Sequence, residues 1–245
     1  MALRRAFFFL IVAMLAAMPL TRAEAAGNVA VDLALVLAVD VSSSVDPTEA
    51  ITQRAGYIYA LRDKRVHDAV RGGPIGRVAI SYVEWSSPTQ QRVVIPWRII
   101  TDGEGAKKIA DELEKLPYQA GTTTSISGGI DFAANMFKSM DFEPVRKVID
   151  VSGDGYSDYG RPVTQARDEA VAAGITINGL AIMTPRPPGL APTPDDLDTY
   201  YRDNVIGGPG SFYLPIHILE DFSRAILQKM VLEISSLMPP REPSA

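Results

Sequence analysis

The chain has 245 residues, with no cysteine, two histidines and a formal net charge of −5. The missing cysteines exclude disulfides, thiolate metal sites and a thiol nucleophile, and the negative charge argues against a general nucleic-acid role, which needs a basic face. Hydrophobic residues make up 47% and charged residues 22%, a balance typical of a folded globular protein with one large domain or two small ones. We therefore expect functional sites built from carboxylate, hydroxyl and carbonyl oxygens.

Residues 1–25 have the features of a secretory signal peptide. Arg4 and Arg5 precede an apolar run at residues 6–18, and small residues follow at the positions where a signal peptidase cleaves. The apolar run is shorter than the roughly 20 residues that span a bilayer. We predict cleavage after Ala25 and an exported protein, periplasmic or secreted, with no transmembrane segment in the mature chain.

The remaining sequence alternates between apolar runs typical of strands and amphipathic stretches typical of helices. A nearly continuous apolar run at 31–41 predicts a strand buried on both faces. Pro96 favours an edge position for the strand expected at 92–99. The pattern predicts strands at 31–41, 77–85, 92–99, 145–152, 175–183 and 212–215, and helices beginning near 47, 104, 125, 162 and 219. This order predicts an α/β fold: a doubly wound, mostly parallel central sheet with helices on both faces and one antiparallel edge strand.

Within the helix expected after Pro47, residues Ile51, Ala55, Ile58 and Leu61 keep helical spacing and predict its apolar stripe. The residues at 184–194 are rich in proline and predict a stiff surface loop.

Oxygen-bearing side chains gather where predicted strands end. The first strand ends at Asp40, and Ser42 and Ser44 follow in the pattern D-x-S-x-S. Asp154 follows the fourth strand in an Asp-Gly pair, and three threonines at 122–124 precede a helix. Because the functional crevice of an open α/β sheet lies outside the carboxyl ends of its strands, we expect these segments to meet.

This set of side chains suits a hard divalent cation such as Mg²⁺, which prefers oxygen ligands and keeps some of its waters. In such a site the hydroxyls would bind the ion directly, and the two carboxylates would act largely through water. Each segment also has a plain structural interpretation, since Asp and Ser after a strand often cap a helix and Asp-Gly often forms a turn.

The ordered combination resembles a von Willebrand factor A-type domain, whose metal-ion-dependent adhesion site (MIDAS) is D-x-S-x-S, then Thr, then Asp. The segment 124–130, Thr-Ser-Ile-Ser-Gly-Gly-Ile, resembles the family's Thr motif and points to Thr124 as its threonine. The resemblance extends over about residues 29–237 and implies one domain at 26–237, followed by a tail at 238–245. It implies Mg²⁺ or Mn²⁺ as the cofactor, and a metal site that captures a Glu or Asp of a partner protein without catalysis. The implied metal residues are Asp40, Ser42, Ser44, Thr124 and Asp154.

The chain departs from the family pattern at several positions. Thr122 and Thr123 replace the usual glycine pair, and Asp150 and Ser152 place polar groups in a normally apolar strand. With these departures the chain resembles a bacterial exported subfamily of unassigned function. Glu84 is expected to end its strand in solvent, with a supporting role near the metal as the alternative.

Two other functions fit parts of the pattern. A haloacid-dehalogenase-like phosphatase would use Asp40, Thr124, Lys147 and Asp154 in this order, but it needs an acid where Ser42 stands, and a serine cannot protonate the leaving group at neutral pH. The second alternative is a scaffold domain of the von Willebrand factor A-type fold whose metal site is degenerate and binds no metal. Serine hydrolysis is disfavoured because no G-x-S-x-G elbow occurs.

Overall fold

The computed structural model describes residues 28–45, 47–186 and 192–235. The predicted signal peptide (1–25) and the predicted tail (238–245) lie outside the described residues. The described residues form one six-stranded sheet with the order β3-β2-β1-β4-β5-β6. Its strands are β1 (Val29–Asp40), β2 (Val78–Trp85), β3 (Gln91–Ile100), β4 (Phe142–Gly153), β5 (Ile175–Ile182) and β6 (Tyr213–Ile216).

The sheet confirms the predicted fold class. All neighbouring strands run parallel except β3, which pairs antiparallel with β2 at the edge. β1 lies between β2 and β4 and is buried from Val31 to Asp40. A strand covered on both faces needs apolar side chains on both, which explains its nearly continuous apolar sequence.

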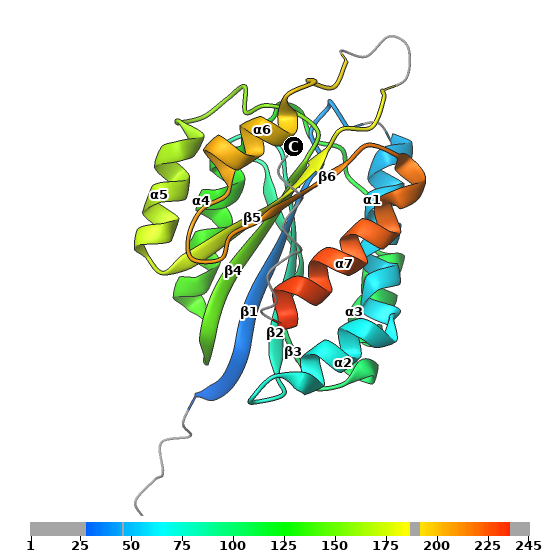
Figure 1. Cartoon of the computed structure of the whole chain (residues 1–245), viewed down its shortest axis with the longest axis vertical. Helices are drawn as coiled ribbons and strands as arrows, with labels where there is room; N and C mark the ends of the chain where they lie inside the picture. The colour runs from blue at the N-terminus through cyan, green and yellow to red at the C-terminus, as the bar shows by residue number, and fades with distance from the viewer. Residues whose placement is uncertain (1–27, 46, 187–191, 236–245) are drawn as a thin grey trace, which may run out of the picture.

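Helices cover both faces of the sheet (Figure 1). The helices are α1 (Pro47–Arg62), α2 (Lys64–Gly72), α3 (Gly103–Lys115), α4 (Ile126–Met136), α5 (Val163–Ala172), α6 (Leu197–Tyr200) and α7 (Phe222–Ser235). Short 3-10 turns lie at Phe137–Ser139 and Leu219–Asp221, and a π-helical turn at Tyr201–Val205 continues α6. Among the described residues, no helix combines the length and the apolar character needed to cross a membrane.

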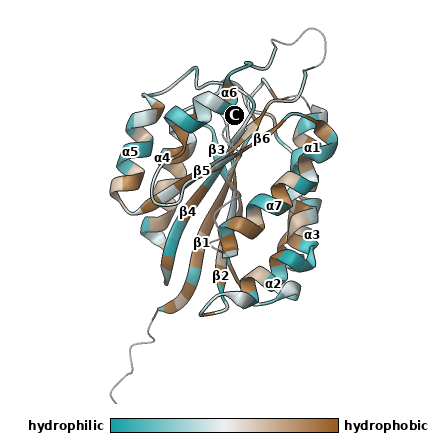
Figure 2. Cartoon of the chain, viewed as in Figure 1, coloured by the Kyte–Doolittle hydropathy of each residue, from teal (hydrophilic) through white to brown (hydrophobic). Residues whose placement is uncertain are grey.

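Two apolar cores lie on the two sides of the sheet. Leu33, Leu35 and Leu37 of β1 pack with residues of α1, α2, α3 and α7, while the alternate residues Ala34 and Val36 pack with α4 and α5. Successive side chains of a strand point to opposite faces, so one strand supplies both cores. Figure 2 shows apolar residues along the central strands of the sheet.

The predicted apolar stripe of α1 is wrong over most of its length, because Ile51 and Ala55 are exposed, Ile58 is half-buried and Leu61 alone of the four is buried. Ile51 is 62% exposed, whereas Tyr57 and Ala60 are buried. A Cβ atom added to Gly56 would lie 2.5 Å from Ile226 Cδ1, so the helix presents its small residues to α7. The close approach to α7 therefore sets the rotation of α1 and leaves Ile51 in solvent.

The sequence did not predict helix α2. Four of its nine residues are charged, and only Val66, His67 and Val70 are buried. The Asp63 side chain accepts a hydrogen bond from the Arg65 backbone N–H and caps the helix. With so few apolar positions, the helix depends on tertiary contacts that a periodicity argument does not include.

Candidate metal centre

Strand β1 ends at Asp40, which is 0% exposed. The Ser42 backbone N–H donates a 2.7 Å hydrogen bond to Asp40 Oδ1. This local turn brings the Ser42 and Ser44 hydroxyls to 2.9 Å from each other. The D-x-S-x-S segment therefore places one carboxylate and two hydroxyls at the carboxyl end of the central strand.

The loop after β4 supplies the second carboxylate. Asp154 is buried directly after β4, and the Ser44 hydroxyl donates to Asp154 Oδ1 at 2.7 Å. β1 and β4 are parallel neighbours, with Val39 paired to Ser152, so their carboxyl ends lie side by side. The two carboxylates predicted from the sequence thus belong to one cluster.

The threonine loop joins the same cluster through backbone hydrogen bonds. Gly121 N–H donates to Val41 O at 2.6 Å, and Ser43 N–H donates to Thr122 O at 2.8 Å. These bonds hold the loop against the D-x-S-x-S segment.

Among the threonines, the Thr124 hydroxyl donates to Ser42 Oγ at 3.1 Å, whereas the Thr122 hydroxyl donates to Gln90 at 2.7 Å. The structure therefore brings together all five sequence-predicted residues. The hydroxyls of Thr124, Ser42 and Ser44 form a hydrogen-bonded chain that ends at Asp154. Asp40 joins this chain because it accepts the backbone N–H of Ser42.

One oxygen of the cluster, Asp40 Oδ2, is buried and makes no hydrogen bond to any residue that the structure describes. Burial raises the pKa of the Asp40 carboxyl well above its usual range, and the charge of Asp154 raises it further. The hydrogen bond from Ser42 opposes this shift in pKa. An unpartnered carboxylate oxygen in a buried site is unfavourable, and a bound cation would satisfy it.

Tyr201 is a neighbour of this oxygen that the sequence did not indicate. Its hydroxyl is buried and has no hydrogen-bond partner among the described residues. Burial raises the pKa of the Tyr201 phenol well above its usual range, and the charges of Asp40 and Asp154 raise it further. A Cβ atom added to Gly153 would lie 2.8 Å from the Tyr201 hydroxyl and 2.9 Å from Asp40 Oδ2. Gly153 is therefore the position that lets both groups approach the end of β4.

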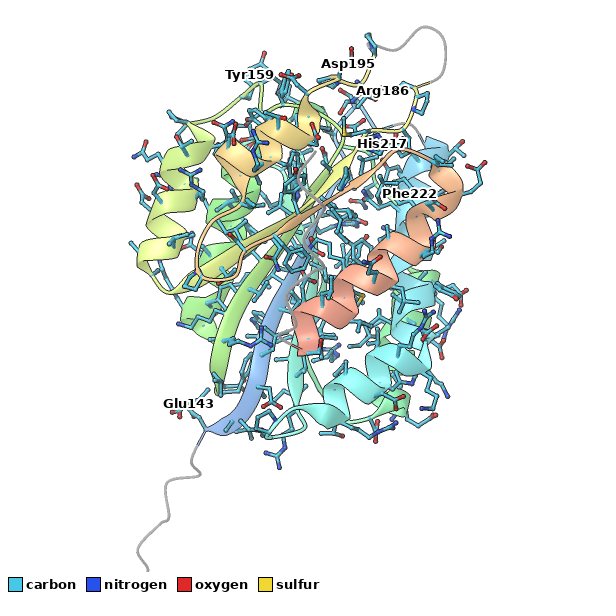
Figure 3. The ribbon with its side chains drawn as sticks, in the orientation of Figure 1. Glu143, Tyr159, Arg186, Asp195, His217 and Phe222 are labelled. Atoms are coloured by element: carbon cyan, nitrogen blue, oxygen red, sulfur yellow. The ribbon has the colours of Figure 1, made fainter. Side chains whose placement is uncertain are left out.

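Arg186 is the second residue that the sequence did not indicate. Its Nη2 lies 2.6 Å from Asp154 Oδ2 and donates to the Asp154 carbonyl oxygen at 2.7 Å. The side chain comes from the proline-rich segment after β5, where sequence patterns predict only a surface loop. Figure 3 shows Arg186 at the same end of the molecule as Tyr159 and Asp195, opposite to Glu143.

The donor set fits a hard cation. Among the described residues, no group of three or more His, Cys, Asp or Glu side chains could hold a metal. A metal here would therefore depend on the hydroxyls of Ser42, Ser44 and Thr124 besides the two carboxylates. Hydroxyl and carboxylate oxygens are ligands that Mg²⁺ accepts, and the unpartnered Asp40 Oδ2 has capacity for it.

The expectation that Glu84 ends its strand in solvent is wrong. Glu84 is 3% exposed, and its two carboxylate oxygens pair with Arg54 and Arg92. A carboxylate is buried only when its charge is balanced, and the two arginines balance it from α1 and β3. Glu84 therefore joins α1 to the edge of the sheet.

The structure does not bring together the four residues that a haloacid-dehalogenase-like phosphatase would use. Lys147 pairs with Ala34, six residues before Asp40 along β1. At about 3.3 Å per strand residue, this places Lys147 roughly 20 Å from the end of the strand. Asp40 and Lys147 therefore do not share a site.

A family model described as "Protein of unknown function (DUF1194)" matches residues 30–238. No curated protein sequence matches the chain. Among solved structures, a von Willebrand factor type A protein from Catenulispora acidiphila is similar with a TM-score of 0.57 and 13% identity, over 84% of this chain and 43% of that one.

The pilus adhesin SpaC from Lactobacillus rhamnosus GG is similar with a TM-score of 0.59 and 14% identity, over 84% of this chain and 31% of that one. Proximal thread matrix protein 1 from the mussel byssus, in a structure with a zinc-occupied MIDAS motif, has a TM-score of 0.55 and 16% identity, over 85% of this chain and 48% of that one. The chain thus spans less than half the length of each of these proteins. At these identities the likeness shows the fold, and the fold is that of a von Willebrand factor A-type domain.

Proposed function

Since the chain belongs to the DUF1194 family, described as proteins of unknown function, we propose a function from its site. The protein is an exported interaction domain that holds Mg²⁺ or Mn²⁺ at the carboxyl end of its sheet. It uses the ion to capture a Glu or Asp side chain of a partner protein. The predicted signal peptide at residues 1–25 supports export, with the domain at 26–237 as the mature part and 238–245 as a tail.

The observation that carries this proposal is the convergence of five oxygen-bearing side chains from three separate segments. The hydroxyls of Ser42, Ser44 and Thr124 form a continuous chain, and hydroxyl groups hold a cation without cancelling its charge. Asp40 and Asp154 supply the negative charge that keeps the ion in place. When bound, the ion supplies an electrophilic centre for an outside carboxylate.

The structural relatives support the same function. SpaC is a pilus adhesin, and the mussel matrix protein has been solved with a zinc-occupied MIDAS motif. A metal-dependent contact with a partner protein is the role that we extend from them to this chain. No catalytic role is proposed, because the described residues do not bring Lys147 to Asp40 as the phosphatase would require.

One observation favours a second candidate, an interaction domain of the same fold that works without metal. The Arg186 guanidinium already provides a positive charge beside Asp154. A metal-free domain would bind its partner through other surfaces, and Asp40 substitutions would leave that binding unchanged.

Carboxylate capture is tested with Mn²⁺ and a small acidic probe. Mn²⁺ broadens the proton signals of molecules that bind next to it, so N-acetylglutamate α-amide, whose one carboxylate is that of the side chain, is titrated with the Mn²⁺-loaded protein and its acetyl methyl signal is followed by NMR. We expect broadening beyond that caused by the same total Mn²⁺ with the Asp40→Asn protein, and less broadening of the neutral analogue N-acetylglutamine α-amide, which has no carboxylate. Equal broadening of both probes would contradict carboxylate capture, and equal broadening with both proteins would favour the metal-free domain.

A further inference from the structure

Arg186 makes several close contacts with Asp154 of the candidate metal site. Its Nε and Nη2 atoms lie 3.1 Å and 2.6 Å from Asp154 Oδ2, and Nη2 also donates to the Asp154 backbone oxygen. Its side chain is only 7% exposed. Three contacts to one residue in a buried setting make this a specific interaction.

The two oxygens of the Asp154 carboxylate have different partners. Oδ1 accepts the Ser44 hydroxyl, and Oδ2 accepts Arg186. A guanidinium is charged at every physiological pH, so it balances one of the two buried carboxylates of the cluster. The charge that a divalent cation would balance is thus partly balanced by a side chain of the protein itself.

A divalent cation and this guanidinium oppose each other. Both need the Asp154 carboxylate, and like charges at a few ångströms repel strongly where water is excluded. We propose that Arg186 is the internal counter-ion of the metal-free site, and that a divalent cation binds by displacing the guanidinium from Asp154. This regulation rests on the metal-binding function proposed above.

The displacement involves the side chain of Arg186 more than its backbone. Met183 N–H donates to Ile216 O at 2.7 Å, and Thr184 is buried and accepts the Thr193 hydroxyl at 2.9 Å. These bonds fix the chain just before Arg186. A Cβ atom added to Gly155 would lie 3.8 Å from Arg186 Nη2, at van der Waals distance, so the guanidinium lies beside Gly155.

The test compares two substitutions of similar length and different charge. Mg²⁺ is titrated by calorimetry into the wild type, Arg186→Gln and Arg186→Lys. Loss of the competing charge in Arg186→Gln is expected to tighten Mg²⁺ binding by between about 5-fold and 150-fold, the usual range of coupling between two ligands. Arg186→Lys keeps the charge and is expected to bind Mg²⁺ nearly as weakly as the wild type. Arg202→Gln is the control, since Arg202 is exposed and pairs with Asp203, its neighbour in the chain.

Thermal unfolding provides a second measurement that does not depend on calorimetric heat. Without metal, Arg186→Gln leaves two buried carboxylates unbalanced, so its Tm is expected to fall below that of the wild type. Mg²⁺ is then expected to raise the Tm of Arg186→Gln more than it raises the Tm of the wild type.

The outcomes separate the two proposals. If Mg²⁺ binds the wild type and binds Arg186→Gln equally or more weakly, competition by Arg186 is wrong and the metal site stands. If none of the proteins binds Mg²⁺, both the metal site and the competition are wrong.

Discussion

The Ser44 hydroxyl donates a 2.7 Å hydrogen bond to Asp154 Oδ1, although the two residues lie 110 positions apart in the sequence. The bond joins the loop after β1 to the loop after β4. It follows from the parallel pairing of these strands, which places their carboxyl ends side by side. This relationship makes one cluster out of two motifs that are each unremarkable alone.

The two neighbouring threonines should differ in their effect on metal binding. Thr124→Ala is expected to weaken Mg²⁺ binding by at least about tenfold, because its hydroxyl belongs to the chain through Ser42. Thr122→Ala is the matched control, since the Thr122 hydroxyl donates to Gln90 outside the cluster. Calorimetric titration of Mg²⁺ measures both. A similar loss in the two variants would contradict the assignment of Thr124.

Gly153 should tolerate no side chain. Gly153→Ala would place a Cβ atom 2.8 Å from the Tyr201 hydroxyl and 2.9 Å from Asp40 Oδ2, so we expect the free energy of unfolding to fall by about 1–3 kcal/mol. The displaced Asp40 would also weaken Mg²⁺ binding. Urea denaturation measures the first effect. Gly72→Ala is the control, because no heavy atom lies within 4 Å of the added Cβ atom, and a loss as large as that of Gly153→Ala would show that crowding is not the cause.

The buried Glu84 should be a major source of stability. Glu84→Gln removes the charge that balances Arg54, whose side chain is only 10% exposed, and we expect a loss of about 3 kcal/mol or more in the free energy of unfolding. Glu114→Gln is the control, because Glu114 pairs with Arg62 at the surface and is 56% exposed. Chemical denaturation should show no measurable change for the control. A wild-type stability for Glu84→Gln would contradict the importance of this pair.

A buried cluster under α7 should make stability depend on pH. Lys229 contacts Asp150 and Glu233, and all three side chains are buried. Burial, followed by the charge of Asp150, raises the pKa of Glu233 from 4.5 to about 7. Between these values the folded protein keeps a proton that the unfolded chain has lost. The contribution of Glu233 to stability is therefore present at acid pH and falls as the pH rises from about 4.5 to 7.

Glu233→Gln removes this titration, so its free energy of unfolding should fall less steeply than that of the wild type across the same pH window. Urea denaturation at a series of pH values measures the slope. The Asp150 carboxyl, whose pKa is also raised by burial, remains in the variant and keeps part of the dependence. Equal slopes for the two proteins would contradict the assignment to Glu233.

The fold and the five candidate ligands could be predicted from the sequence for a physical reason. Strands buried on both faces need unbroken apolar runs, so a polar residue such as Asp40 at the end of one is conspicuous. The parallel order of the strands then implies that Asp40 and Asp154 lie at the same edge of the sheet. The resemblance to a known motif separated Thr124 from its two neighbours, and local sequence alone did not.

The other features depend on contacts between distant segments. Arg186 lies in a proline-rich segment with no periodic pattern, and nothing in its sequence indicates that the side chain returns to Asp154. Tyr201 reaches Asp40 only because α6 and its π-helical continuation pack against the sheet. Helical spacing predicts Ile51 in the core, because spacing alone does not say which of two similar faces the neighbouring helix covers.

The central claim is that Asp40 and its neighbours hold a divalent cation, and calorimetric titration of Mg²⁺ into the wild type and Asp40→Asn tests it most directly. Asparagine keeps the size of the side chain and an oxygen for the Ser42 N–H but removes the charge. Asp111→Asn serves as the control, because Asp111 is an exposed residue near the end of α3. We predict saturable Mg²⁺ binding to the wild type and the control, weakened by at least about tenfold in Asp40→Asn. Equal binding by all three proteins, or no binding by any of them, would contradict the metal centre.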